Sequence, residues 1–168
     1  MSEMLNETTL MKTRRGSTLK VLAILSWIWI GFMTLMTLPS VFSGPMSADE
    51  MEDAKVDILT SLTPEMIKIL GQDFVKENIA FLEKSNEYHY SILGINLASY
   101  VLGFYAVFLM YNLKKTGYYL YVVYSLIPVV TPLLFFDGGI IRAMSIAFGL
   151  VFAILFCILY GVQVKRMS

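Results

Sequence analysis

The sequence of 168 residues has only one cysteine, Cys157, and one histidine, His89. A single thiol excludes an intramolecular disulfide and a cysteine-based metal site, and a single imidazole excludes a histidine cluster. Glycine-rich phosphate-binding patterns and the His-Glu-x-x-His zinc pattern are absent as well. Because no acid, base, nucleophile or metal-ligand set converges, we expect no enzymatic activity and no cofactor.

Charge is also scarce, since charged residues make up 15% of the chain and hydrophobic residues 57%. A soluble domain carries about a quarter charged residues. The mean hydropathy is +0.65, and the apolar residues fall into four blocks, which is typical of a multi-pass membrane protein. The formal net charge is zero, and we expect the lipid bilayer, and no nucleic acid, as a partner.

We predict an all-α fold, a four-span transmembrane helix bundle with an acidic extracytoplasmic helical hairpin between spans 1 and 2. The first apolar block exceeds the 7–15 or so residues of a signal-peptide core, so we expect it to be a retained span. The predicted spans are residues 19–42, 90–111, 118–136 and 140–162. The predicted connections are a tail 1–18, the acidic segment 43–89, a turn 112–117, an outer turn 137–139 and a tail 163–168.

The acidic segment carries ten carboxylates against four lysines. Ser47 with Glu50 three residues later predicts a capping box and a helix over residues 47–59. Thr63 followed by Pro64 and Glu65 predicts a second helix, Pro64–Leu70. Beyond a break at Gly71, residues 73–115 are predicted to form one continuous helix of about 65 Å, amphipathic in its first half and membrane-spanning in its second.

Basic residues predict the orientation of the chain in the membrane. The outer turn 137–139 has only one basic residue near it, Arg142, whereas eight basic residues lie on the opposite side. The positive-inside rule therefore places both termini in the cytoplasm and the acidic segment outside. The expected location is a bacterial inner membrane. The basic residues gathered on the predicted cytoplasmic side are Lys12, Arg14, Arg15, Lys20, Lys114, Lys115, Lys165 and Arg166.

Small residues recur every four positions along the last span, as Ser145, Gly149, Ala153, Cys157 and Gly161. Such a ridge lets helix backbones approach closely in lipid. One interpretation is packing within a single bundle, and the other is a docking site for a second copy or a membrane partner, carried by Ser145, Gly149 and Ala153.

Other polar residues at the membrane have two interpretations each. Asp137 and Arg142 flank the outer turn, where they can reach water or each other. Tyr124 lies deeper and either packs with a satisfied hydroxyl or lines a small pocket. His89 is interfacial, because a metal site needs three or four convergent ligands.

By elimination, the acidic segment is the best functional candidate. Its exposed carboxylates predict a docking surface for a basic periplasmic or extracellular partner. The stretch Asp49-Glu50-Met51-Glu52-Asp53 lacks the glycine and the spacing of a calcium loop and opens a helix instead. The plainer interpretation is a solvated cap over the bundle.

Three features give the chain a recognisable layout: the basic stretch Lys12-Thr13-Arg14-Arg15, the acidic outer segment and the turn Lys114-Lys115-Thr116-Gly117-Tyr118-Tyr119-Leu120-Tyr121. In this layout the chain resembles small four-pass bacterial inner-membrane proteins of unknown function. The resemblance implies no activity. We therefore expect a non-enzymatic membrane accessory or interaction protein, and the alternative is a subunit of a small oligomeric transporter or channel.

Overall fold

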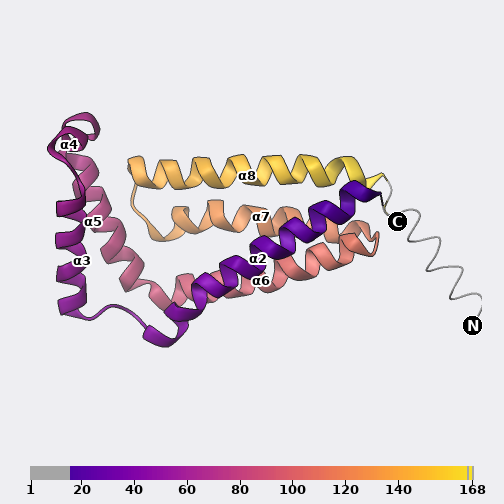
Figure 1. Ribbon diagram of the computed structural model, residues 1–168, viewed down its shortest axis with the longest axis horizontal. Helices are drawn as coiled ribbons and strands as arrows, with labels where there is room; N and C mark the ends of the chain where they lie inside the picture. Colours follow the sequence, from indigo (N-terminus) through magenta and orange to yellow (C-terminus); the bar gives the residue numbers. More distant parts are fainter. Residues whose placement is uncertain (1–15, 166, 168) are drawn as a thin grey trace, which may run out of the picture.

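The computed structural model describes residues 16–165 and Met167, and in this part of the chain every regular element is an α-helix (Figure 1). The predicted all-α class is therefore confirmed. The basic positions Lys12, Arg14, Arg15 and Arg166 lie outside the described residues. The seven helices are α2 (Ser17–Ser43), α3 (Ala48–Ser61), α4 (Pro64–Leu70), α5 (Gln72–Glu87), α6 (His89–Tyr111), α7 (Lys115–Phe135) and α8 (Ile140–Val164).

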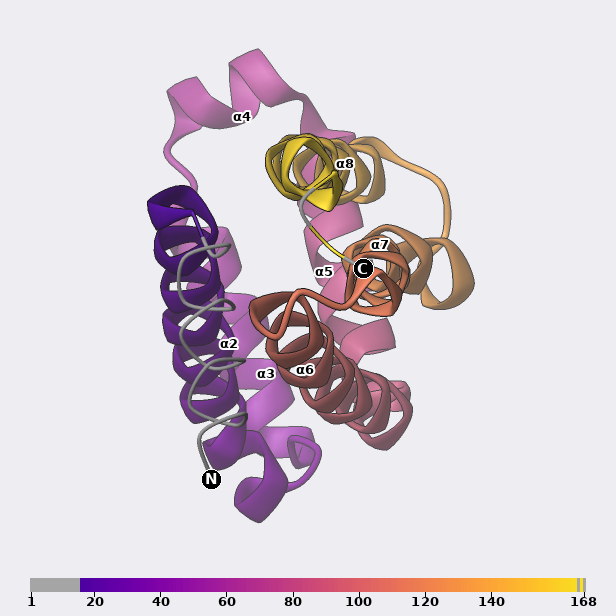
Figure 2. The same ribbon diagram turned by 90° about the vertical axis from the view of Figure 1, so that its right-hand side faces the viewer.

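Four of these helices, α2, α6, α7 and α8, are long and apolar enough to cross a membrane. The shortest, α7, has 21 residues and is about 32 Å long, which matches a hydrocarbon core of about 30 Å. The four run side by side in alternating directions, so that α2 begins and α8 ends at the same end of the bundle (Figure 1). Viewed along the four long helices, α2 lies beside α6, α6 beside α7 and α7 beside α8, while α2 and α8 stand farther apart (Figure 2).

The helices α3, α4 and α5 form a transverse segment that lies across the other end of the bundle (Figure 1). Their starts follow the predicted signals. Ser47 and Glu50 form the capping box of α3, and Pro64 is the first residue of α4. Gly71, with φ of 86°, separates α4 from α5 as expected, because this left-handed conformation is disfavoured for residues with a Cβ.

The prediction of one continuous helix over residues 73–115 is wrong. The helix is interrupted at Tyr88, with φ −98° and ψ 20°, and the chain turns sharply there from α5 into α6 (Figure 1). The second part of the predicted helix, α6, ends at Tyr111, before Leu113 adopts a positive φ of 61°. The bend has a packing cause, because it brings Phe81 of α5 onto Phe136 with ring centroids 4.1 Å apart. A straight rod would carry α5 away from the bundle.

Close packing concentrates at the end where α2 begins and α8 ends. Ala23 of α2, Met110 of α6 and Tyr160 of α8 are fully buried there. Gly117 lets α7 approach α6, because a Cβ at this position would lie 2.6 Å from the carbonyl oxygen of Ala106. The Ser26 and Tyr160 hydroxyls form a hydrogen bond of 2.9 Å that joins α2 to α8.

Candidate interaction surface

The acidic residues singled out from the sequence lie on α3, and all four are exposed: Asp49, Glu50, Glu52 and Asp53. Glu50 has a structural task, since its Oε2 accepts a hydrogen bond of 2.7 Å from the Ser47 backbone N–H. In return, Ser47 Oγ accepts one of 3.3 Å from the Glu50 N–H. The bond from the Ser47 N–H lowers the pKa of the Glu50 carboxyl. Asp49, Glu52 and Asp53 therefore present the acidic surface, while Glu50 also fixes the start of the helix.

Two polar contacts hold α3 and its entry to α5. Lys55 Nζ lies 2.6 Å from Glu83 Oε1, and this carboxylate raises the pKa of Lys55. The Asn86 amide pairs with the backbone of Met46, accepting from its N–H at 2.6 Å and donating to its carbonyl oxygen at 3.1 Å. Because the amide satisfies both backbone polar groups of one residue, it fixes the chain just before the capping box.

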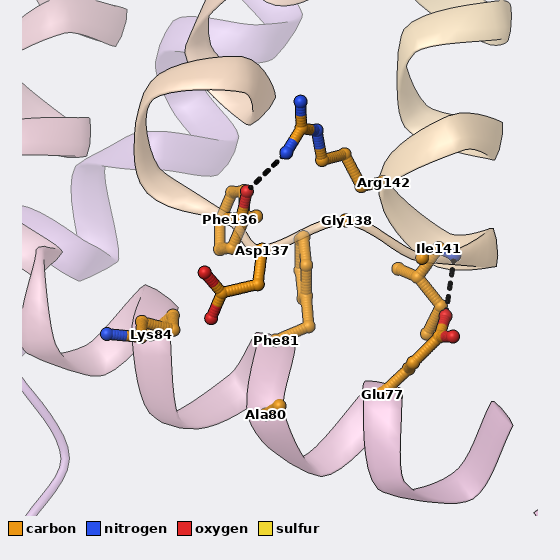
Figure 3. A pocket seen from close by; sticks show the side chains of 10 residues that line it. Glu77, Ala80, Phe81, Lys84, Phe136, Asp137, Gly138, Ile141 and Arg142 are labelled. Carbon is orange, nitrogen blue, oxygen red and sulfur yellow. Dashed lines mark hydrogen bonds between the residues drawn. The ribbon is translucent and has the colours of Figure 1, made fainter. Parts of the chain in front are cut away.

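Glu77 connects α5 to the last span (Figure 3). Its Oε2 accepts hydrogen bonds from the backbone N–H groups of Ile140, at 2.6 Å, and Ile141, at 3.2 Å. These are the first two residues of α8, whose N–H groups have no partner within the helix and carry the positive end of its dipole. Gly139 makes room for this carboxylate, because a Cβ there would lie 2.5 Å from Glu77 Cδ.

Glu77 is not among the site residues predicted from the sequence, because it lies 63 residues before the first residue of the helix that it caps. One signal was available. The start of α8 follows Gly138-Gly139, has no acidic residue in its first turn and has no side-chain cap of its own. A helix end without a local cap needs a partner from elsewhere if it is covered by protein.

The turn between α7 and α8 closes over α5 around a cavity of about 50 Å³ (Figure 3). Phe81 and Phe136 stack at its floor, and Arg142 donates to the Phe136 carbonyl oxygen at 3.1 Å. Asp137 lies on the side of Lys84, whose pKa is raised chiefly by its hydrogen bond to Glu87. Such a small volume holds about one or two water molecules and suits a packed joint rather than a substrate site.

The small-residue ridge of α8 lies along α7. A Cβ at Gly149 would be 3.1 Å from Val129 Cγ2, and Ala153 is buried. Ser145 donates to the Ile141 carbonyl oxygen of its own helix at 2.9 Å. At Gly149 the ridge therefore packs against α7 of the same chain.

Of the other candidates at the membrane, His89 has a polar partner and Tyr124 is closely packed. His89 Nε2 lies 3.0 Å from the carbonyl oxygen of Ser40, which ties α6 to the end of α2. Tyr124 lies against Gly103, whose missing Cβ would come within 2.7 Å of its ring. Among the described residues, no three His, Cys, Asp or Glu side chains are grouped to hold a metal ion.

No protein-family model, curated protein or solved structure matches this chain. Functional inference therefore starts from the surface and contacts above. The arrangement offers a carboxylate-rich helix face, held in place by a chain of contacts that runs from α3 through α5 to α8.

Proposed function

We propose that the protein is a non-enzymatic membrane accessory or interaction protein, and that α3, α4 and α5 form an acidic extracytoplasmic hairpin that docks a basic protein partner. The observation that carries the proposal is the fixed position of an exposed acidic surface. Asp49, Glu52 and Asp53 face solvent on α3, whereas Lys55 holds the same helix to α5. A surface held in place loses less conformational entropy when it binds than a mobile segment does.

Charge supports a basic partner. The segment 43–89 has an excess of six carboxylates over lysines, and like charges on a partner would be repelled. Exposed charges of one sign raise the rate of encounter with an oppositely charged partner and make it sensitive to salt. We therefore expect binding that weakens as ionic strength rises.

The proposed orientation puts both termini in the cytoplasm of a bacterium and the transverse segment outside the inner membrane. Lys114 lies in the turn between α6 and α7 and Lys115 is the first residue of α7, at the end of the bundle opposite the transverse segment. Lys165 follows the end of α8 at that same end, and Lys20 lies in the first turn of α2. This distribution supports the positive-inside assignment. The resemblance to small four-pass inner-membrane proteins is proposed on the same layout.

The proposal can be tested with a photo-crosslinking amino acid in place of Glu52 in cells. We expect a crosslinked adduct of defined mass, which is lost when Asp49→Asn and Asp53→Asn are combined. The matched control is Glu65→Gln with Asp73→Asn, which removes two exposed charges from α4 and α5. An adduct that survives loss of the α3 acids, or is lost equally in the control, would argue against docking on α3.

The alternative function is a subunit of a small oligomeric transporter or channel. It draws on hydroxyl groups that lie between the spans, namely the Ser26–Tyr160 pair and the Thr37–Tyr100 pair, which is separated by 3.2 Å. Within each pair the two hydroxyls bond to each other across a helix interface, so the pairs serve packing between the spans equally well. Flux of a solute or ion in vesicles that contain only this protein would favour the alternative.

A further inference from the structure

An open groove of about 470 Å³ lies on the side of the bundle, between the start of α7 and the end of α8. Gly161 shapes it, because a Cβ there would lie 3.2 Å from the hydroxyl oxygen of Tyr118. The tyrosine ring therefore lies against the α8 backbone. The residues that line the groove are Tyr118, Ile154, Cys157, Ile158, Gly161 and Val162.

Measured along α8, the groove is about as long as one lipid leaflet is thick. Its lining on α8 runs from Ile154 to Val162, which is about 12 Å of helix, against a hydrocarbon core of about 30 Å. It begins near the middle of the span and ends one turn before Lys165. An apolar groove that opens sideways at this depth faces acyl chains and not water.

Two lysines lie at the end of the groove. Lys165 follows Gly161 by four residues and Val162 by three, so it continues the same face of α8. Lys115 precedes Tyr118 by three residues and lies on the matching face of α7. Both lysines are exposed. Positive charge at the membrane surface thus adjoins an apolar slot beneath it.

We propose that this groove binds one anionic phospholipid from the leaflet at that end of the spans. One acyl chain would lie along α8 between Ile154 and Val162, and the phosphate would lie between Lys115 and Lys165. A lysine near the membrane surface attracts an anionic headgroup. The groove supplies the apolar part of the site and the lysines supply the preference for charge.

A second copy of the chain fits the groove less well, although Cys157 and Gly161 are small. Helix dimers on such residues need close approach of two backbones, and the Tyr118 ring already lies against Gly161. A two-fold dimer through this face would also bring equivalent surfaces together, so the lysines of both copies would meet. Like charges in that position repel.

Native mass spectrometry of the purified full chain in detergent tests the site, with palmitoyl-oleoyl phosphatidylglycerol and palmitoyl-oleoyl phosphatidylcholine as probes. We expect one tightly bound phosphatidylglycerol and weaker phosphatidylcholine binding. Lys165→Gln should weaken phosphatidylglycerol binding about fivefold, the effect of one lysine near an anionic surface. Lys20→Gln, which removes a charge from α2 near that end, should leave it unchanged.

The groove itself is tested by Val162→Trp, which fills it, against Val151→Trp on the same helix outside the lining. Both valines are exposed to a similar degree, at 67% and 62%. We expect only Val162→Trp to abolish the phosphatidylglycerol adduct, with both variants melting as the parent does. Equal loss in the two variants, equal binding of both lipids, or a dimer disrupted by Val162→Trp would overturn the proposal.

Discussion

The two ends of the four-span bundle are held together by different means. At the end where α2 begins, the spans share a core that includes Leu19, Ala23, Ala106, Met110 and Tyr160. At the opposite end the spans are joined by the transverse segment, through Glu77 on the start of α8 and Phe81 on Phe136. Among the described residues, packing of the spans with the adjoining Leu113 and Met167 closes the first end, whereas the transverse segment joins the spans at the second. Breaking each kind of contact should therefore have effects of different size and reach.

The largest effect should come from the core of buried side chains. Tyr160 is fully buried and bonded to Ser26, so Tyr160→Ala leaves a large cavity and removes the hydrogen bond that joins α8 to α2. We expect a loss of about 3 kcal/mol, near the low end for truncation of a buried aromatic residue, since lipid is as apolar as the core. Steric trapping or thermal unfolding in detergent measures it. Tyr119→Ala, at a position 65% exposed, is the control and should change stability little.

An intermediate effect is expected halfway along the bundle, at the seam of α7 and α8. Gly149→Leu pushes a side chain toward Val129, which already lies 3.1 Å from the position of a Cβ. Overpacking of this kind costs about 1–3 kcal/mol. Leu150→Ala, on an exposed neighbouring position, should matter less in the same thermal assay. If Gly149→Leu melted like the parent but no longer bound a co-purifying membrane partner, the ridge would be an external interface instead.

A smaller effect, confined to the other end, should follow the loss of the α8 cap. Glu77→Ala leaves the N–H groups of Ile140 and Ile141 without their carboxylate. The expected cost is about 1 kcal/mol, as for other helix caps. Hydrogen exchange should show faster exchange at Ile140 and Ile141 and in α5, with no change at Met110. Glu65→Ala on α4 is the matched control, and uniform loss of protection in Glu77→Ala would refute a local cap.

The smallest effect should come from pH at the start of α3. The Ser47 N–H holds the folded-state pKa of Glu50 below its ordinary value of 4.5. The contribution to stability is therefore complete above this value and is lost as the pH falls through the lower folded-state pKa. Exchange at the Met51 amide, corrected for its intrinsic pH dependence, should rise on acidification. Glu50→Gln should remove most of that pH dependence, and an unchanged profile would contradict the role of the capping box.

The features that could not be predicted from the sequence depend on contacts between distant parts of the chain. Spans and capping signals are local, so four apolar helices, the Ser47–Glu50 box and the α4 helix Pro64–Leu70 were all predictable. The bend at Tyr88 was not, because residues on both sides favour helix and contacts with distant residues, Phe81 with Phe136 and Glu77 with the start of α8, draw α5 across the bundle. Glu77 looked like one more surface carboxylate among ten.

The candidate surface shows the same division. Exposure of Asp49, Glu52 and Asp53 followed from the charge of an amphipathic helix. The contacts that hold this helix in place, Lys55 with Glu83 and Asn86 with Met46, join residues 28 and 40 positions apart. Spacing along the sequence gives no sign of such pairs. These pairs can be identified only from the fold, in which α3 and α5 lie side by side.

The proposed function requires that the transverse segment lie on the outer side of the inner membrane and that both termini lie in the cytoplasm. The most direct measurement is labelling with a membrane-impermeant thiol reagent in spheroplasts, using Ser47→Cys or Ser168→Cys in a chain that carries Cys157→Ala. We predict labelling of the cysteine at position 47 in intact spheroplasts, and of the cysteine at position 168 only after the membrane is permeabilised. Labelling at position 168 in intact spheroplasts, with protection at position 47, would contradict the account.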